Sequence, residues 1–550
     1  MNKKISKKKR SRNVTERTVS KNKLNAHKVI PSYELRYFYV DNFKPFSLEK
    51  VPKSQENLKL PEYKPLTLIV GPNSAGKSAL IQSLMLFSQS LKGRSGLRIL
   101  NSRAPEVDLG KYESFINTHD TKKKLTSLIT IHENFHNDKK ENIIHHYHSK
   151  YFMNDEGRAN LEGVMYYSVL EKDSDKVSFS SKKDNIMNFT SETKTDDIVS
   201  TFKLKDNLPK DLLDNLKNST LDRDGKIKVQ LSEKEIIKFV KHMRFTDINY
   251  SGVPEITDKG AVLGMNQKEI EELMGMIKKN PRDFFHLYDV VDQYLKNSSK
   301  SIKRFFNKVR YIGPYRDKPK RSQRNIGEFV NVGPSGENTP NILFHNRDHI
   351  IDINSALKTL GVEYEIDIEK FGDPSIDEMF SLTLRDKRIK FNKKKDKISS
   401  VDVGFGIFQF LPIILQGISE QKSIIPCEQP EIHLHPKLVA NLTDFFIETS
   451  NLKIENKHRL FKINPQHLNK NRYIFGNQWI IETHSELLIR RICRRIREGK
   501  INNNDVSVLY VNPPTKEINT ATVKRLHINE KGRFIDRWPE GFFAEALDEL

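Results

Sequence analysis

The pattern of apolar and polar positions predicts strands and a helix near the start of the chain. Residues 33–40 and 66–70 are rich in aromatic and β-branched side chains, which is typical of strands. From Ser78 to Leu91 the apolar residues recur at helical spacing. A strand, a glycine-bounded turn and a helix therefore follow one another between residues 66 and 91.

The C-terminal part repeats the same order of elements. Segments 423–446, 478–499 and 506–514 each begin with an apolar run that is expected to be a strand, and the first two continue into a helical pattern. A further apolar strand ends at Gly313 in "VRYIGPYRDKPKR". Strands alternating with helices favour an α/β fold.

The middle of the chain has a different pattern. Residues 125–132 and 141–152 look like two strands around a turn at 137–140. Residues 150–230 are polar with short apolar islands, which indicates an insertion with strands and loops, and residues 232–309 have helical patterns. We therefore expect an inserted, mainly helical domain between two parts of an α/β core.

Composition limits the class of protein. The chain has 550 residues, of which 36% are hydrophobic and 30% charged, and no apolar run approaches the roughly 20 residues of a membrane span. The basic N-terminus is not followed by an apolar segment, so it does not resemble a secretory signal. Two cysteines fit a reducing compartment. These features predict a cytoplasmic protein that does not contact membranes.

The net charge of +22 is concentrated at the start of the chain. Residues 1–28 carry eleven Lys or Arg and one acid, Glu16, and few apolar side chains. Such a segment is expected to be a disordered basic arm that attracts the phosphate backbone of DNA or RNA. A solubilising tail is the alternative interpretation.

The segment "GPNSAGKS" fits the pattern G-x-x-x-x-G-K-[ST] between a predicted strand and a predicted helix. Loop amides and the helix N-terminus would bind the phosphates of ATP, with Lys77 reaching the β- and γ-phosphates and Ser78 binding Mg²⁺. The candidate nucleotide-binding residues are Asn73, Ser74, Ala75, Gly76, Lys77 and Ser78.

Two later strand ends carry polar residues that could complete this site. Glu428 ends the strand in "IIPCEQPE" and is a candidate Mg²⁺ ligand, because ligands of α/β sheets bind at the C-terminal ends of the strands. His484, in "WIIETHSELL", ends a second strand and is expected to contact the γ-phosphate.

With these motifs in place, the chain resembles an ABC-type AAA-family ATPase of the branch that contains OLD, RecF and SMC-like heads. "GPNSAGKS" is similar to the Walker A motif, "IIPCEQPEIHLHP" to Walker B and "ETHS" to the switch-histidine motif. "SVDVGFGIFQFLP" occupies the place of the signature motif. "YIGPYR", "VGPSGEN" and "RFIDRWPEGFF" resemble a subgroup in which many members serve anti-phage defence, including the Septu ATPase subunit PtuA.

The resemblance implies an ATPase head split into two lobes that form one sheet. The implied domains are a basic arm (1–30), an N-terminal lobe with Walker A (31–150), an inserted helical domain (151–304) and a C-terminal lobe (305–550). It also implies that two or more copies associate through bound ATP. Gly404 and Gly406 of one signature segment, or Ser399 and Ser400 upstream, would then meet the γ-phosphate held by the other copy.

Two departures from the family pattern matter. Gln429 stands where the glutamate that positions the attacking water is usual, and a glutamine cannot accept a proton. Glu431, two residues on, would lie on the same face of an extended segment and could substitute. The signature segment also lacks a serine, with Phe408 in one such place. We expect slow hydrolysis, and binding without hydrolysis remains an alternative.

Three functions fit these observations. The first is the ATP-binding regulatory subunit of a bacterial anti-phage complex that gates a separate nuclease, of HNH type as in Septu, since no D-x-D pair follows His484. The second is a stand-alone DNA-repair or recombination ATPase. The third is an ATP-locked scaffold for a nucleic acid, such as the reverse-transcribed product of a retron.

Two further clusters were weighed for chemistry. His132, His136 and the histidines of "HHYH" have no standard zinc spacing and are interpreted as hairpin residues. The arginines of "IRRICRRIR" fit equally a helix C-terminus and a nucleic-acid surface.

Overall fold

The computed structural model describes most of the N-terminal and C-terminal parts of the chain, without residues 1–30 and 540–550. The described residues are 31–47, 61–134, 142–170, 187–191, 201–204, 244–246, 299–372, 378–388, 397–403, 406–450 and 476–539, with single positions between 271 and 297.

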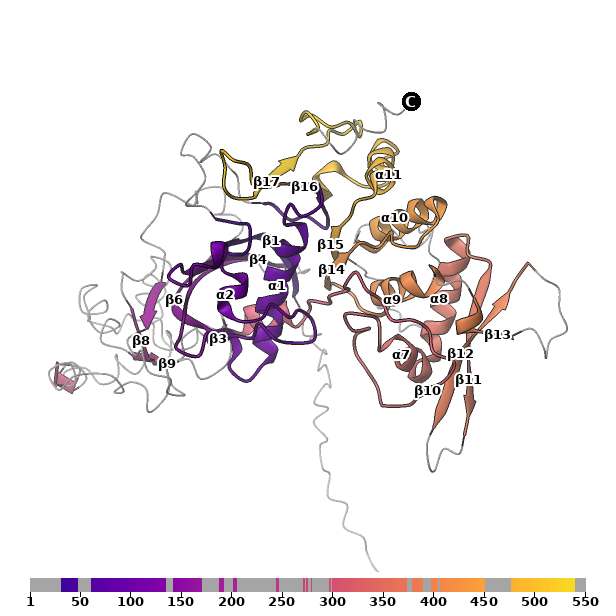
Figure 1. Ribbon diagram of the computed structural model, residues 1–550, viewed down its shortest axis with the longest axis horizontal. Coiled ribbons are helices and arrows are strands. Elements are labelled where there is room, and N and C mark those ends of the chain that lie inside the picture. Colours follow the sequence, from indigo (N-terminus) through magenta and orange to yellow (C-terminus); the bar gives the residue numbers. More distant parts are fainter. Residues whose placement is uncertain are drawn as a thin grey trace, which may run out of the picture.

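A five-stranded sheet lies at the centre of the molecule (Figure 1). Its strand order is β14-β15-β2-β16-β17, and only β17 is antiparallel to its neighbour. Backbone hydrogen bonds between residues 308–312 and β14 add a further parallel stretch at the β14 edge. The strands are β2 (Leu66–Val70), β14 (Ile424–Glu428), β15 (Gln478–Glu482), β16 (Val506–Asn512) and β17 (Thr522–Leu526).

The parallel strands are apolar on both faces because both faces are covered. Leu66, Leu68 and Val70 of β2 pack in one hydrophobic core, and Ile69 packs in another. The same alternation holds in β15, where Ile480 joins the core of Ile69. Because the side chains on both faces are apolar, the sequence pattern predicted the strands but did not show which residues point to which face.

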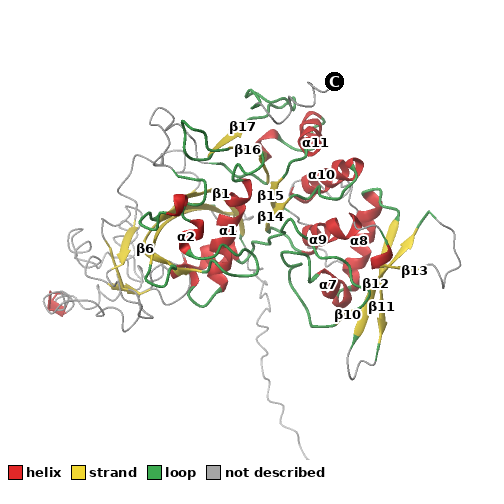
Figure 2. Ribbon diagram, viewed as in Figure 1, coloured by secondary structure: helices red, strands yellow, loops and turns green. Residues whose placement is uncertain are grey.

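One face of the central sheet is covered by helix α1 (Lys77–Lys92) and an antiparallel sheet. Figure 2 shows these strands curving behind α1. The order of the antiparallel sheet is β1-β4-β5-β6-β7-β8-β9, and β3 pairs with β6. Its strands are β1 (Ser32–Asp41), β3 (Ile99–Leu100), β4 (Leu125–Asn134), β5 (Ile143–Met153), β6 (Ala159–Leu170), β7 (Met187–Ser191), β8 (Thr201–Leu204) and β9 (Arg244–Thr246); the short helix α2 (Tyr112–Phe115) packs beside them.

The other face is covered by helices from the C-terminal part (Figure 1). A small sheet of order β10-β12-β11, with β13 beside β12, lies at the outer edge of these helices. These elements are β10 (Gln323–Arg324), α7 (Thr339–His345), α8 (Arg347–Thr359), β11 (Tyr364–Phe371), β12 (Met379–Asp386), β13 (Lys397–Ser399), α9 (Gly406–Ser419), α10 (Pro436–Ser450) and α11 (Glu486–Arg497).

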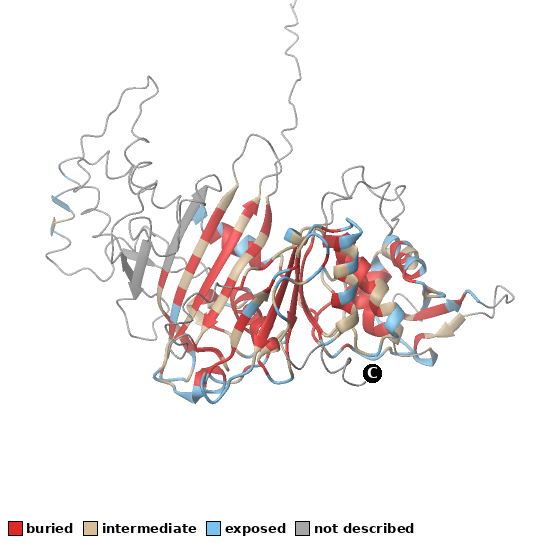
Figure 3. Ribbon diagram, turned by 90° about the horizontal axis from the view of Figure 1, so that it is seen from above, coloured by how far each residue is buried: buried red, intermediate tan, exposed pale blue. Residues whose placement is uncertain are grey.

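Burial follows this layering. Figure 3 shows buried residues concentrated on the central strands, and buried and less buried residues alternating along the antiparallel strands. Gly417 of α9 allows a close approach here, because an added Cβ would lie 2.7 Å from the Phe445 ring and 3.1 Å from Trp479. Trp479 itself is fully buried, and its indole N–H donates to the Thr449 hydroxyl at 2.9 Å.

The boundary expected between residues 150 and 151 needs correction. It falls inside β5, which pairs with β6 through a tight turn that includes Gly157 at φ +75°. The sequence "NDEGR" at 154–158 is the turn that the sequence analysis missed. The antiparallel sheet therefore continues into the segment expected to be mainly helical. Residues 299–306 are helical, but most of the expected helices lie outside the described residues, as does the basic arm.

Within the described ranges, no helix has both the length and the apolar character needed to cross a lipid bilayer.

Candidate nucleotide-binding site

The loop between β2 and α1 forms one side of a cavity of about 570 Å³. Gly71 (φ +144°) and Gly76 (φ +108°) both adopt backbone angles that favour glycine, and Ser74 is left-handed at φ +60°. Helix α1 begins at Lys77 with no side-chain cap. The loop residues that line the cavity are Asn73, Ser74, Gly76, Lys77 and Ser78, whereas Ala75 is fully buried in the core.

Lys77 is folded into this loop. Only 4% of the residue is exposed, and its ammonium donates to the carbonyl of Pro72 at 2.7 Å. Burial lowers the pKa of Lys77, and the nearby carboxylate of Glu482 opposes that effect. A cation therefore lies inside the loop, as the Walker A pattern predicts.

Ser78 contacts an acid that the sequence analysis did not select. Its hydroxyl donates to Glu482 Oε1 at 2.9 Å. Glu482 is the last residue of β15, which lies directly beside β2, so its carboxylate meets the start of α1. The available signal was an acid at the C-terminal end of a predicted parallel strand, the same signal that selected Glu428.

Glu428 ends β14 at the same edge of the sheet and is buried. The Tyr311 hydroxyl donates to Glu428 Oε1 at 2.6 Å. Desolvation by burial and the charge of Glu482 raise the pKa of Glu428, and burial likewise raises the pKa of Glu482. Two carboxylates thus lie close together next to Ser78 in a water-poor environment.

Gln429 lines the cavity in an unusual backbone conformation, with φ +45°. Its N–H donates to the Glu482 carbonyl at 2.8 Å. Arg316, which is 5% exposed, donates to the carbonyls of Glu428 (2.5 Å) and Gln429 (3.1 Å). Tyr311 and Arg316 of the "YIGPYR" segment therefore both donate hydrogen bonds to the Walker B segment.

Glu431 does not line the cavity. Its Oε1 accepts from the backbone N–H of His484 at 2.7 Å, and its Oε2 is buried without a hydrogen-bond partner among the described residues. The chain turns through residues 430–433 after left-handed Gln429, so the alternation expected of an extended segment does not apply. Glu431 ties the Walker B turn to the loop after β15.

His484 lines the cavity opposite the loop that carries Lys77. Burial and the charge of Lys77 lower the pKa of His484, which favours the neutral imidazole. A neutral imidazole can donate one hydrogen bond and accept another.

Two cavity residues come from unexpected places. Lys44 and Gln82 line it, and the ammonium of Lys44 donates to Gln82 Oε1. Burial lowers the pKa of Lys44. Lys44 follows β1 at a left-handed position, and no motif around it pointed to a role in the site.

The described residues of the signature segment do not line this cavity. Gly404 lies outside the described residues. Gly406 begins α9, and a Cβ added there would lie 3.0 Å from the carbonyl of His433, so α9 starts against the Walker B turn. Whether Gly406 meets ATP held by a second copy stays a prediction.

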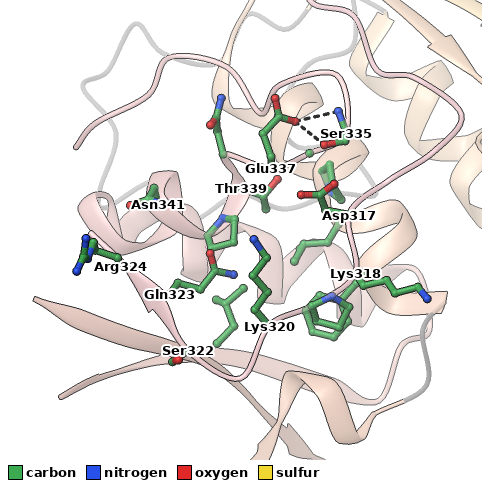
Figure 4. A pocket seen from close by; sticks show the side chains of 18 of the residues that line it. Asp317, Lys318, Lys320, Ser322, Gln323, Arg324, Ser335, Glu337, Thr339 and Asn341 are labelled. Atoms are coloured by element: carbon green, nitrogen blue, oxygen red, sulfur yellow. Dashed lines mark hydrogen bonds between the residues drawn. The ribbon is translucent and has the colours of Figure 1, made fainter. Parts of the chain in front are cut away.

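A second cavity, of about 580 Å³, lies between the loop after Arg316, α7 and α9 (Figure 4). Lys320 extends into it, while Glu337 accepts hydrogen bonds from the backbone and hydroxyl of Ser335. Its glycine turn, through Gly333 and Gly336, follows no strand and leads into the seven-residue helix α7, so the first cavity is the candidate for nucleotide.

The two clusters weighed in the sequence have structural roles in the described residues. His145 contacts Glu133 at 2.8 Å within the antiparallel sheet, and the described residues hold no group of three or more His, Cys, Asp or Glu able to bind a metal. On α11, Arg491 and Arg495 both pair with Asp444, while Arg490 and Arg494 pair with glutamates of their own helix region. These ion pairs favour the interpretation that the charges on this helix are neutralised by acids of the same chain.

Both thiols are expected to be unreactive in the folded protein. Burial raises the pKa of Cys427 to about 12 and that of Cys493 to about 11. Because the thiolate is the reactive form, neither should react with a thiol reagent such as DTNB at about pH 8, and both should react in denaturant. One fast equivalent from the native protein would contradict this.

Comparison with protein families decides the assignment of the chain. Residues 34–489, more than half of the chain, match the family described as "AAA ATPase domain". The chain belongs to this AAA ATPase family. Residues 501–550, which include β16 and β17 of the ATPase sheet, match a second family, "Protein of unknown function (DUF3696)". A search of curated proteins gave no match.

Solved structures similar to this AAA ATPase include two SMC heads. One is the Smc head domain with an extended coiled coil bound to the C-terminal domain of ScpA, from Pyrococcus furiosus, at 10% identity and TM-score 0.36, covering 90% of this chain and 96% of that one. The other is the SMC head domain from Thermotoga maritima, at 10% identity and TM-score 0.30, covering 90% of this chain and all of that one.

Proposed function

We propose that this AAA ATPase binds ATP and Mg²⁺ in the cavity between β2 and α1 and hydrolyses the nucleotide slowly. The observation that carries the proposal is the bond from Ser78 to Glu482 beside buried Lys77, at the end of a glycine-bounded loop. The loop, its lysine and the start of α1 suit phosphate groups. A hydroxyl and two carboxylates suit Mg²⁺, which prefers oxygen ligands. The bound ion would neutralise phosphate charge.

Slow hydrolysis follows from the groups that face the cavity. Gln429 and His484 line it, and Glu431 is engaged with a backbone amide outside it. The Gln429 amide can orient a water molecule but cannot accept its proton. The neutral form of His484, which its lowered pKa favours, can contact phosphate without adding positive charge.

Replacing Gln429 with glutamate is expected to raise ATP turnover about tenfold or more, because a carboxylate can act as general base. The rate would be measured as phosphate release at saturating MgATP. Gln429→Ala is the matched control and should not accelerate the reaction. If Gln429→Glu turns over no faster than the wild type, the missing carboxylate does not limit hydrolysis.

The finer part of the proposal is a regulatory role. We infer that copies associate through bound ATP and gate a separate nuclease in an anti-phage complex in the cytoplasm. Support comes from the resemblance of "YIGPYR" and "VGPSGEN" to defence ATPases. It also comes from Gln429, whose amide cannot accept a proton from the attacking water.

A stand-alone DNA-repair ATPase is the second candidate, favoured by the net charge of +22. The turnover assay separates the two when it is repeated with added DNA. The regulatory role predicts an unchanged rate for the protein alone, and the repair role predicts a rate that DNA stimulates.

A further inference from the structure

Two buried carboxylates meet at the ends of β14 and β15. Glu482 is 2% exposed and Glu428 is 4% exposed. Glu482 Oε1 accepts from the Ser78 hydroxyl at 2.9 Å, while Glu428 Oε1 accepts from the Tyr311 hydroxyl at 2.6 Å. Both strands are parallel and in register at these residues, so the pairing is set by the backbone of the sheet.

The two acids are not fully compensated by the described residues around them. The two carboxyl groups interact directly with each other, and Glu482 Oε2 is buried with no N–H group of the described residues donating to it. The neighbouring cations are already engaged: Lys77 with the Pro72 carbonyl, and Arg316 with two backbone carbonyls. Burying charged groups without paired charge or hydrogen bonds is costly. A divalent cation between the carboxylates would remove this cost.

We infer that Glu482, with Glu428 and Ser78, forms a divalent-cation site that is able to fill before the nucleotide binds. The inference rests on the proposed function and deepens it, because it assigns Glu482 to the metal and sets an order of binding. All three donors are oxygens, which selects Mg²⁺ or Mn²⁺ over softer metals.

Glu431 is excluded from this role by geometry. Its carboxylate accepts from the backbone N–H of His484 at 2.7 Å, whereas the carboxylate of Glu482 accepts from the Ser78 hydroxyl at 2.9 Å, beside Glu428. Strand β15, which lies between β14 and β2, therefore supplies the second acid.

The test is a titration of the nucleotide-free full chain with Mn²⁺, in which electron paramagnetic resonance measures the concentration of free ion. The wild type is expected to bind one ion that Mg²⁺ displaces. Glu482→Gln should weaken Mn²⁺ affinity at least about tenfold. Glu498→Gln, on an exposed acid paired with Arg494, is the matched control and should not change it.

Two further variants keep the test decisive if Glu482→Gln does not fold. Ser78→Ala should weaken Mn²⁺ binding. Glu482→Asp keeps the negative charge and should weaken it by less than about tenfold. A wild type that binds no Mn²⁺ without nucleotide, or folded Ser78 and Glu482 variants with unchanged affinity, would overturn the inference.

Binding of a fluorescent ATP analogue in excess Mg²⁺ is measured separately on the same proteins. Its absence in the wild type would overturn the proposed function. Normal nucleotide binding with unchanged Mn²⁺ affinity in the variants would overturn the metal assignment alone.

Discussion

Replacing Lys77 with alanine is expected to weaken ATP binding roughly 100-fold, equal to about 2.7 kcal/mol. The ammonium is buried inside the phosphate loop, where a charge interaction is stronger than in water. The main chain of the loop should persist, since Gly71 and Gly76 set its shape. Affinity would be measured with a fluorescent ATP analogue in excess Mg²⁺.

Lys92→Ala provides the control on the same helix. Lys92 lies at the other end of α1, is 38% exposed at its side chain and pairs with Glu106 at 3.0 Å. Its loss should leave nucleotide affinity within about twofold, since exposed pairs contribute little. Equal effects of the two substitutions would show that the loop does not hold the phosphates.

Replacing Arg316 with alanine is expected to lower the free energy of unfolding by roughly 3 kcal/mol, because two buried carbonyls lose a charged donor. The guanidinium binds the carbonyls of Glu428 and Gln429, and its own carbonyl accepts from Gln409 Nε2 on α9 at 3.4 Å. The affinity for nucleotide in the presence of metal should also fall, because the Walker B segment loses the hydrogen bonds from Arg316. Urea unfolding and nucleotide titration would be run together.

Arg321→Ala is the matched arginine on the same loop. Arg321 is exposed and pairs with exposed Asp402 at 2.8 Å, so its removal should leave the free energy of unfolding nearly unchanged. A loss for Arg316→Ala no larger than that for Arg321→Ala would contradict the bridging role.

The sequence was sufficient where a local pattern determines local structure. The continuous apolar run of β2, its glycine-bounded turn and the helical spacing of α1 led directly to Lys77 and Ser78. The alternating pattern of β5 also predicted a strand. The turn through Gly157 that extends the sheet was instead interpreted as part of a polar insertion.

What the sequence could not give was the order of strands. Glu482 reaches Ser78 only because β15 lies between β14 and β2, and no spacing in the chain encodes that neighbour relation. Glu431 was placed by an alternation rule that fails when left-handed Gln429 starts a turn. Both differences arise from tertiary geometry and backbone conformation, not from side-chain chemistry.

The pairing of β2 with β15 and β16 has a consequence for how the protein is made. The Leu35 backbone and the Gln478 side chain bond each other across 443 positions, and β2 completes its pairing only with β16. During synthesis the loop after β2 leaves the ribosome well before its sheet partners β15 and β16. Contacts of such large sequence separation form slowly and leave unpaired strand edges exposed meanwhile. On a growing chain the candidate nucleotide site therefore cannot assemble before β16 (Val506–Asn512) has been made.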